Sequence, residues 1–264
     1  MDDVLSRAAA FVRRVGAASD RLRLVHVLDG TPATGETAAA ILIGQRPDGG
    51  FAPPWAHGYS SIDTTCFRLA QANQVGVGAD RPEVTAMFRF LVARQRTDGS
   101  WEEDAVEAAG APPWATPGDT PARLYLTANA GFSLSADRGS EAIERAVRHL
   151  LKALNDDGTL PSYLHANWLA AALFWRVGRH RAALRVLDRV STRLADLESG
   201  GLAWLVTSLV AAGLPIDHAV LVNAGARLVH GQRADGSFPS EDGPEADVHA
   251  TLEAIRALLA LGVS

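Results

Sequence analysis

The sequence predicts an all-α fold, an α6–α6 barrel (α/α toroid) of six helix pairs. Three observations along the 264 residues support this prediction. A phrase of the form Gln-Arg-x-Asp-Gly-x-aromatic recurs, a helical pattern precedes each copy, and a second, more apolar helical pattern follows it. Internal repetition of this kind indicates an architecture of stacked, similar units.

The phrase itself has the composition of a helix stop and a turn. Clean copies lie at residues 45–51, 95–101 and 232–238, with a degenerate copy at 154–160, while residues 199–202 keep only the glycines. Asp hydrogen-bonds nearby backbone and Gly accepts a positive φ, so Asp-Gly favours a turn. We expect the Gln to reach exposed backbone groups. We expect the aromatic residues to hold the repeats together rather than to touch a ligand: these are Phe51, Trp101 and Phe238.

The helical patterns are of two kinds. The first helix of a pair carries charge on one face, as in residues 141–148, whereas the second is apolar nearly all round, as in 163–175. A helix that is apolar all round must be surrounded by protein, so the second helices belong inside the first ones. The expected first helices are 36–44, 82–94, 141–153, 181–194 and 217–231, the second ones are 62–74, 120–132, 163–177, 202–212 and 246–261, and segments 2–15 and 18–28 complete a sixth pair.

Composition limits the classes of function. Hydrophobic residues make up 47% and charged residues 21% of the chain, which predicts a globular rather than a disordered protein, long enough for one large domain or two small ones. The repeat favours a single domain over residues 1–264. The formal net charge is −5 without a basic cluster, so no nucleic-acid partner is expected. The longest uncharged run, 199–216, is too interrupted for a transmembrane segment, although transient contact with a membrane surface stays open. The acidic start predicts no secretory signal, and we expect a cytoplasmic protein; the oligomeric state is left open.

The phrase Gln-x-x-Asp-Gly-x-[Trp/Phe] resembles the repeat of squalene–hopene cyclases, other class II terpene cyclases and protein prenyltransferase β subunits. The resemblance covers nearly the whole chain and implies an α/α toroid around a central cavity. In such a barrel the second helices begin at one rim, so polar residues in their first turns would converge on a small-molecule site. Those residues are Ser60, Ser61, Asp63, Thr64, Thr65, Asp119, Thr120, His165, Asn167, Asp247 and His249.

Residues 61–65 carry the most specific part of the resemblance. Ser-Ile-Asp-Thr-Thr is similar to the Asp-x-Asp-Asp-Thr or Asp-x-Asp-Thr-Thr signature of class II terpene cyclases, with Asp63 in the proton-donating place. This implies an enzyme that protonates a linear isoprenoid or prenylated substrate and so starts its cyclisation. An acid that protonates an alkene must be neutral, dry and held in one geometry. Ser61 stands where the signature has its first Asp, and Thr64 where one version has its last.

The other expected site residues follow from the same implied chemistry. Thr64, Thr65, His165 and Asn167 complete the catalytic group, with His165 and Asn167 expected to hold the acid or to quench the final cation. Loops 52–60 and 105–118 each contain Pro-Pro-Trp and are expected to act as lids. Aromatic and polar residues would bind the substrate and stabilise its cation: these are Trp55, Tyr59, Phe67, Trp114, Asp119, Tyr125, Tyr163, Trp168, Phe174, Trp204, Asp247 and His249.

Several alternatives stay open at the level of sequence. Asp63, Asp119 and Asp247 all fall where a helix needs an N-cap, and capping is the favoured interpretation for Asp119 and Asp247. A zinc-dependent prenyltransferase β-like subunit would need an Asp-x-Cys pair, whereas Asp63 and the single cysteine, Cys66, are three residues apart, and a buried thiol is expected there. The third alternative is a non-catalytic lipid-binding toroid.

Cofactor expectations depend on the head group of the substrate. No cofactor or metal is expected for a neutral head group, while a diphosphate would bring Mg²⁺ with it. In that case the nearest cationic side chains would be Arg46, Arg68 and Arg123.

Overall fold

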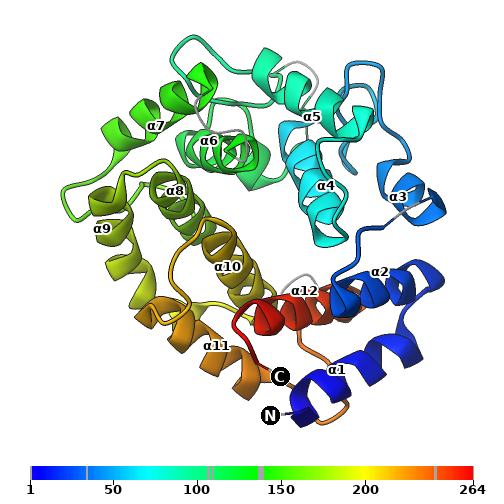
Figure 1. Cartoon of the computed structure of the whole chain (residues 1–264). Coiled ribbons are helices and arrows are strands. Elements are labelled where there is room, and N and C mark those ends of the chain that lie inside the picture. Colours follow the sequence, from blue (N-terminus) through cyan, green and yellow to red (C-terminus); the bar gives the residue numbers. More distant parts are fainter. Residues whose placement is uncertain are drawn as a thin grey trace. The chain divides into compact units, whose positions relative to one another are not determined.

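The computed structural model describes residues 2–33, 35–105, 108, 110–135, 140–240 and 243–263. Over these residues the chain forms helices and no strand, apart from two isolated bridges around Phe51 (Figure 1). The helices are α1 (Asp2–Val15), α2 (Ala18–Asp29), α3 (Gly35–Leu42), α4 (Ile62–Gln74), α5 (Pro82–Ala93), α6 (Thr120–Leu134), α7 (Glu141–Ala153), α8 (Leu164–Arg176), α9 (His180–Ser191), α10 (Ser199–Ala211), α11 (Ala219–Gly231) and α12 (Asp247–Ala260), with 3₁₀ turns η1 (Pro113–Ala115), η2 (Leu194–Asp196) and η3 (Pro244–Ala246).

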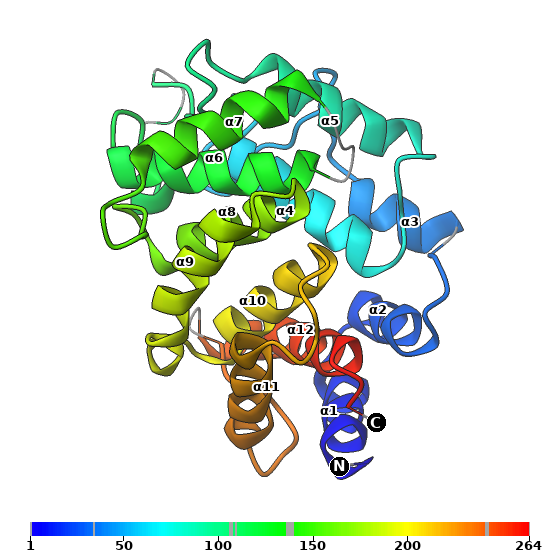
Figure 2. The same ribbon diagram turned by 60° about the vertical axis from the view of Figure 1, so that its left-hand side comes forward.

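The helices group into two compact units. The middle unit combines Ala38–Asn73 with Val77–Arg189, and the terminal unit combines Met1–Thr37, Gln74–Gly76 and Val190–Ser264. In the middle unit α6 packs against α8, with α5 and α7 also in contact with α6 (Figure 2). In the terminal unit α12 packs against α10, α1 and α2, and α11 packs against α10.

The two kinds of helix predicted from hydropathy are both present. In α8 every residue from Ala166 to Phe174 is buried, so this helix is enclosed by protein on all sides. In α7 the buried residues form a single stripe, and the opposite face carries charge. The stripe consists of Ala142, Ile143, Ala146, Val147 and Leu150.

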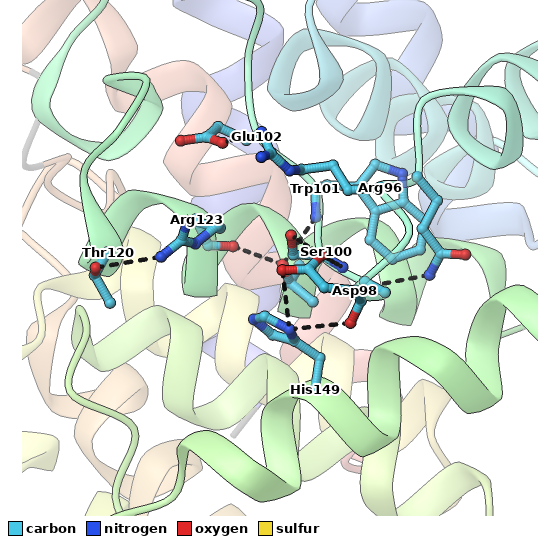
Figure 3. Close-up of polar contacts among 11 residues, drawn as sticks. Arg96, Asp98, Ser100, Trp101, Glu102, Thr120, Arg123 and His149 are labelled. Carbon is cyan, nitrogen blue, oxygen red and sulfur yellow. Dashed lines mark hydrogen bonds and ion pairs between the residues drawn. The ribbon is translucent and has the colours of Figure 1, made fainter.

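The repeated phrase closes each turn with side-chain hydrogen bonds. In the copy at 95–101, the Asp98 carboxylate accepts hydrogen bonds from the Ser100 backbone N–H (3.0 Å) and hydroxyl (2.6 Å), as Figure 3 shows. The Gln95 amide donates to the carbonyl oxygens of Gly99 (3.0 Å) and Ala142 (2.8 Å), the second of which belongs to α7. Equivalent bonds recur in the copies at 45–51 and 232–238. The Gln therefore ties each turn to the following surface helix or, in the last copy, to α1.

Glycine is required in these turns for two reasons. Gly99 has a φ of 88°, which side chains rarely adopt, and a Cβ added there would lie 2.5 Å from the Arg145 carbonyl oxygen. Gly49 and Gly236 show the same combination of positive φ and close approach to a helix backbone.

A second set of bonds links each turn to the helix that follows it. The backbone N–H of the phrase's last residue donates to a side-chain oxygen in the next helix, over 2.7–3.2 Å. The phrase residues Phe51, Trp101 and Phe238 are at most 2% exposed, as predicted for residues that hold repeats together. We call the accepting residues the anchor residues: Thr65, Thr127, Asn167 and Thr251.

One part of the predicted pattern is wrong. Residues 199–202 were expected to form a turn before a helix at 202–212, whereas α10 already begins at Ser199 and includes both glycines. Gly201 is buried in this helix, and Gly200 has φ outside the left-handed region. In the described part of the chain, no helix is long and apolar enough to cross a membrane.

Candidate functional site

Asp63 lies in the first turn of α4 without serving as its cap. The Ser61 hydroxyl occupies that role, because it accepts a hydrogen bond from the Thr64 backbone N–H at 3.1 Å. Ser61 precedes the first residue of α4, as an N-cap should. The carboxylate of Asp63 is therefore free of capping and binds other groups.

Three side chains donate hydrogen bonds to the Asp63 carboxyl. The Tyr125 hydroxyl donates to Oδ1 over 2.6 Å, and the Asn129 amide approaches the same oxygen at 3.5 Å. The Trp114 indole N–H donates to Oδ2 over 3.2 Å. Tyr125 and Asn129 are one turn apart on α6, both buried, and are themselves hydrogen-bonded at 3.2 Å. Residues from α4, α6 and η1 thus meet at one carboxyl group.

The surroundings of this carboxyl favour its neutral form. Burial raises the pKa of Asp63, while the hydrogen bonds from Tyr125, Trp114 and Asn129 oppose that rise. Burial and the neighbouring Asp63 also raise the pKa of Tyr125 well above its ordinary value, so Tyr125 remains a phenol that donates. A neutral carboxylic acid in such a place can give up a proton.

Glu103 is a second buried carboxylate at the start of α4, and sequence reasoning missed it. Its Oε1 accepts from the Ser61 hydroxyl (2.7 Å) and the Asp63 backbone N–H (3.1 Å), and its Oε2 accepts from the Ile62 backbone N–H (3.2 Å). The side chain is only 3% exposed, and burial raises its pKa. Asn129 was missed as well, although an amide in an otherwise apolar helix is a signal that could have found it.

The anchor residues reveal a common register for the site. Asp63, Tyr125 and His165 each lie two residues before an anchor residue. Asp63 touches Tyr125, and the Tyr125 ring in turn meets the His165 ring edge-on, with centroids 4.6 Å apart. The repeats therefore bring three chemically different side chains into one row. His249 has the same register before the anchor Thr251, in the terminal unit.

His165 sits within an aromatic cluster. Its ring stacks on Tyr163 (5.2 Å between centroids, 4° between planes) and lies 6.0 Å from the Trp168 ring. Burial lowers the pKa of His165 to about 4, so the imidazole is neutral at pH 7.

The other two aspartates do not occupy places equivalent to that of Asp63. Asp119 caps α6 by accepting from the Ala122 N–H at 2.8 Å, as predicted. For Asp247 the capping prediction is wrong, because it is the first residue within α12. Its carboxylate instead accepts from the Ser240 N–H (2.8 Å) and pairs with Arg233.

Four expected site residues are used by the fold instead. Thr65 and Asn167 are anchor residues whose side chains are hydrogen-bonded to the turns, so we correct their expected catalytic role. Phe174 has no exposed surface and Trp168 is 1% exposed, so neither ring offers a face to a ligand. Thr64, half-buried beside Asp63, contributes its backbone N–H to the Ser61 cap.

The two loops expected to act as lids differ from each other. Trp114, in η1, is 40% exposed and bonded to Asp63, while residues 106, 107 and 109 of its loop lie outside the described residues. Trp55 in the other loop donates to the hydroxyl of Tyr59 over 3.1 Å, and the pKa of buried Tyr59 is raised to about 12, chiefly by burial. Arg46 donates to two carbonyl oxygens of this loop, at His57 and Gly58, so it anchors the loop.

The remaining candidates of the middle unit lie around the start of α4 and α6. Phe67 is one turn after Asp63 on the same face of α4 and is 46% exposed. Arg68 lies over the Phe51 ring, 5.4 Å from its centroid, and Arg123 lies 3.4 Å from the Thr120 hydroxyl (Figure 3).

His249 and Trp204 belong to the terminal unit. His249 Nδ1 is 3.2 Å from a guanidinium nitrogen of Arg23, which is buried and donates twice to Gln74. Gln74 in turn donates to Glu253 at 2.6 Å. This network balances the buried charge of Arg23 within its own unit. Trp204 is half-buried in α10.

The metal-binding alternative can be compared with the donors that are present. Among the residues that the structure describes, no three His, Cys, Asp or Glu side chains gather closely enough to hold a metal ion. Cys66 is buried, as predicted, and burial raises the pKa of its thiol. A thiol kept protonated in this way is a poor zinc ligand.

The fold was compared with known proteins. No family model matches the sequence, and no curated protein matches it significantly. Among solved structures, a protein from Actinoplanes matches with 17% identity and a TM-score of 0.66 over 99% of both chains. The type II terpene cyclase MstE from Scytonema, in a variant bound to its product merosterolic acid A, matches with 14% identity and a TM-score of 0.62, over 100% of this chain and 97% of that one.

A second variant of MstE, bound to its substrate geranylgeranyl dihydroxybenzoate, matches with 13% identity and a TM-score of 0.60, over 100% of this chain and 97% of that one. At such identities the likeness concerns the fold. It confirms the fold class predicted from the sequence: this chain has the all-α, α/α-toroid fold of the type II terpene cyclases.

Proposed function

We propose that this protein is a proton-initiated, class II terpenoid cyclase in which Asp63 is the acid. The observation that carries this proposal is the state of the Asp63 carboxyl: Ser61 caps the helix in its place, burial raises its pKa, and Tyr125, Asn129 and Trp114 fix it. A cap would need none of these donors. An acid for a weakly basic alkene needs them, because it must be neutral and held in one orientation.

The hydrogen bonds also suggest which oxygen carries the proton. Oδ1 accepts from Tyr125 and is approached by Asn129, so its lone pairs are occupied, whereas among the described residues Oδ2 has one donor, the Trp114 indole. We assign the transferable proton to Oδ2. The alkene takes this proton at one carbon, its other carbon becomes a cation, and further double bonds attack that cation in turn to form rings.

The reaction ends when the last cation loses a proton. His165 is the proposed acceptor, because burial keeps its imidazole neutral and therefore basic, and even a base whose pKa is about 4 suffices for so strong an acid as a carbocation. The rings of Tyr125 and Tyr163, which contact His165, would stabilise the cation on its way. The proton given by Asp63 is thus matched by the proton lost, and the product is an isomer of the substrate.

For the substrate we propose a linear isoprenoid joined to an aromatic or other polar head group. The likeness in fold to MstE, whose substrate is a geranylgeranyl dihydroxybenzoate, supports this class. Exposed Phe67 and Trp114 beside the acid give it apolar surface to lie on. We further propose that residues 1–264 act as one domain in the cytoplasm, and that no cofactor is needed unless the head group is a diphosphate, which would bring Mg²⁺.

Deuterium incorporation tests the proposal. The purified protein is incubated in D₂O with geranylgeranyl dihydroxybenzoate, a free polyprenol and a polyprenyl diphosphate, and products are analysed by mass spectrometry. Proton-initiated cyclisation should add one deuterium per product molecule and leave the skeleton otherwise isomeric with the substrate. Release of diphosphate without deuterium uptake would refute proton initiation.

The same incubation separates the alternatives. Saturable binding of the substrates without any product would indicate a lipid-binding toroid. Transfer of the prenyl group to a peptide cysteine, dependent on added zinc, would indicate a prenyltransferase β-like subunit.

A further inference from the structure

The cyclase signature has an Asp where this chain has Ser61, and the structure brings a different carboxylate to that place. Glu103 comes from the segment just after the second repeated phrase, 42 residues further along the chain. Its Oε1 accepts from the Ser61 hydroxyl at 2.7 Å, which is one of the shortest bonds at the start of α4.

The backbone donors of the first turn of α4 show what this carboxylate does. Four N–H groups at a helix start have no partner within the helix. Those of Ile62 and Asp63 donate to Glu103, and that of Thr64 donates to the Ser61 hydroxyl that Glu103 holds. Glu103 therefore neutralises the positive end of α4 and fixes the backbone of Asp63 itself.

From these contacts we propose that Glu103 is a positioning residue for the acid, supplying from the neighbouring repeat the carboxylate that Ser61 lacks. This inference rests on the proposed function of Asp63. Glu103 does not touch the substrate; it acts through the first turn of α4, which it holds in place and supplies with a compensating negative charge.

The charge has a definite consequence for Asp63. An Asp in the first turn of a helix ordinarily has its anionic form stabilised by the free N–H groups and the helix dipole. Burial is the main cause of the raised pKa of Asp63. Glu103 accepts hydrogen bonds from two of those N–H groups, and we infer that this contact and its like charge act in the same direction as burial. Among the described residues, the titratable or charged groups that interact with this pair or its neighbours include Tyr125, Cys66, Tyr59, Arg94 and Asp104.

The test follows the protonation of Asp63 directly. The Trp114 indole N–H donates to Asp63 Oδ2, so its resonance in a ¹⁵N-labelled sample reports the ionisation of that carboxyl, and Trp114→Phe assigns the signal. Glu103→Gln keeps the shape of the side chain and removes its charge. We expect the midpoint of the Asp63 titration to fall by at least about one pH unit, because removing a nearby like charge favours the ionised form. The alkaline limit of turnover should move to lower pH by a similar amount.

Two further variants separate positioning from mere support of the fold. Ser61→Asp combined with Glu103→Ala returns a carboxylate to the helix start and should restore the midpoint to near that of the unmodified protein. Ser61→Asp alone adds a second carboxylate and should raise the midpoint, which keeps the inference testable even if Glu103→Gln does not fold. Asp119→Asn, which removes the same charge from the start of α6, is the matched control and should leave the midpoint unchanged.

The outcomes are distinct from those that test the function. An unchanged midpoint in Glu103→Gln, or in Ser61→Asp where Glu103→Gln does not fold, would overturn the inference. The titration does not require turnover, so a protein that cyclises no substrate would refute the proposed reaction while leaving the role of Glu103 measurable.

Discussion

Replacing Asp63 with Asn is the sharpest perturbation of the proposed acid, because it removes the transferable proton and almost nothing else. The cap of α4 is Ser61, so the helix start survives. The amide oxygen can accept from Trp114, and the amide nitrogen can donate to the Tyr125 oxygen, so the losses are the hydrogen bond donated by the Tyr125 hydroxyl and the weak contact to Asn129 at 3.5 Å. One such bond is worth about 1 kcal/mol, or about 2–4 °C in Tm for a chain of this size.

Turnover should respond far more strongly. Proton transfer opens the reaction, and no neighbouring group on α4 or α6 is an equivalent acid. We expect Asp63→Asn to lower kcat by about 1,000-fold or more, which corresponds to about 4 kcal/mol of activation free energy. The assay is single-turnover cyclisation in D₂O with product quantified by mass spectrometry. Asp119→Asn, which exchanges one good cap for another, should retain most of the activity.

The same variant also changes how stability depends on pH. Because burial raises the folded-state pKa of Asp63 above its unfolded value, stability is highest below the unfolded pKa and falls as pH rises through the folded pKa. An amide at this position does not ionise and carries no such penalty, so the Tm of Asp63→Asn minus that of the unmodified protein should grow with pH. Near-normal cyclisation by Asp63→Asn, or a Tm difference that shrinks with rising pH, would refute the reasoning.

Four further predictions concern the surroundings. His165→Phe should change the product mixture, because the final proton acceptor is lost. The buried, neutral His165 should lower the stability of the unmodified protein as pH falls from about 6.5 towards the lowered pKa of about 4, and the variant should lack this decrease. Thermal melts between about pH 7 and 4 measure the difference. Trp114→Ala should admit water and yield hydroxylated products, with a smaller effect from Trp55→Ala, whose indole does not bond the acid; equal product profiles would contradict this. Gly99→Ala should lower the free energy of unfolding by at least about 1–3 kcal/mol. Gly200→Ala, where a Cβ would meet open space within α10, should raise the free energy of unfolding by about 1 kcal/mol, and denaturant unfolding measures both. With a prenylated phenolic acid as substrate, activity should survive EDTA, and a loss that Mg²⁺ restores would point to a diphosphate head group.

Most of the fold could be predicted because its signals are local. The predicted bounds of the helices at 62–74 and 141–153 agree with α4 and α7, since a cap or a turn residue marks each end. The failure at α10 has a physical reason. Its two glycines would break an isolated helix, but here they lie in a segment packed against α11 and α12, and tertiary packing overrides propensity.

The candidate site could be predicted only in part. Asp63 could be singled out because its signature is contiguous in sequence, and its role as the acid stays a prediction. Glu103 and Asn129 were missed because their importance depends on which distant segment faces the start of α4. Asn167 was misassigned for the opposite reason: a polar residue in an apolar helix suggests chemistry until its bonds to the turn at Leu160 are seen.

The anchor residues have a consequence for how such a protein can change over evolution. Each one fixes its turn through its own side chain, so the residue two places earlier is held in position without having to contribute to the turn. Asp63, Tyr125 and His165 show that an acid, a phenol and an imidazole are all accommodated at this position. Mutation there can alter reactivity while the hydrogen bonds that define the fold stay intact. A library varied only at this register would therefore explore new chemistry on an unchanged scaffold.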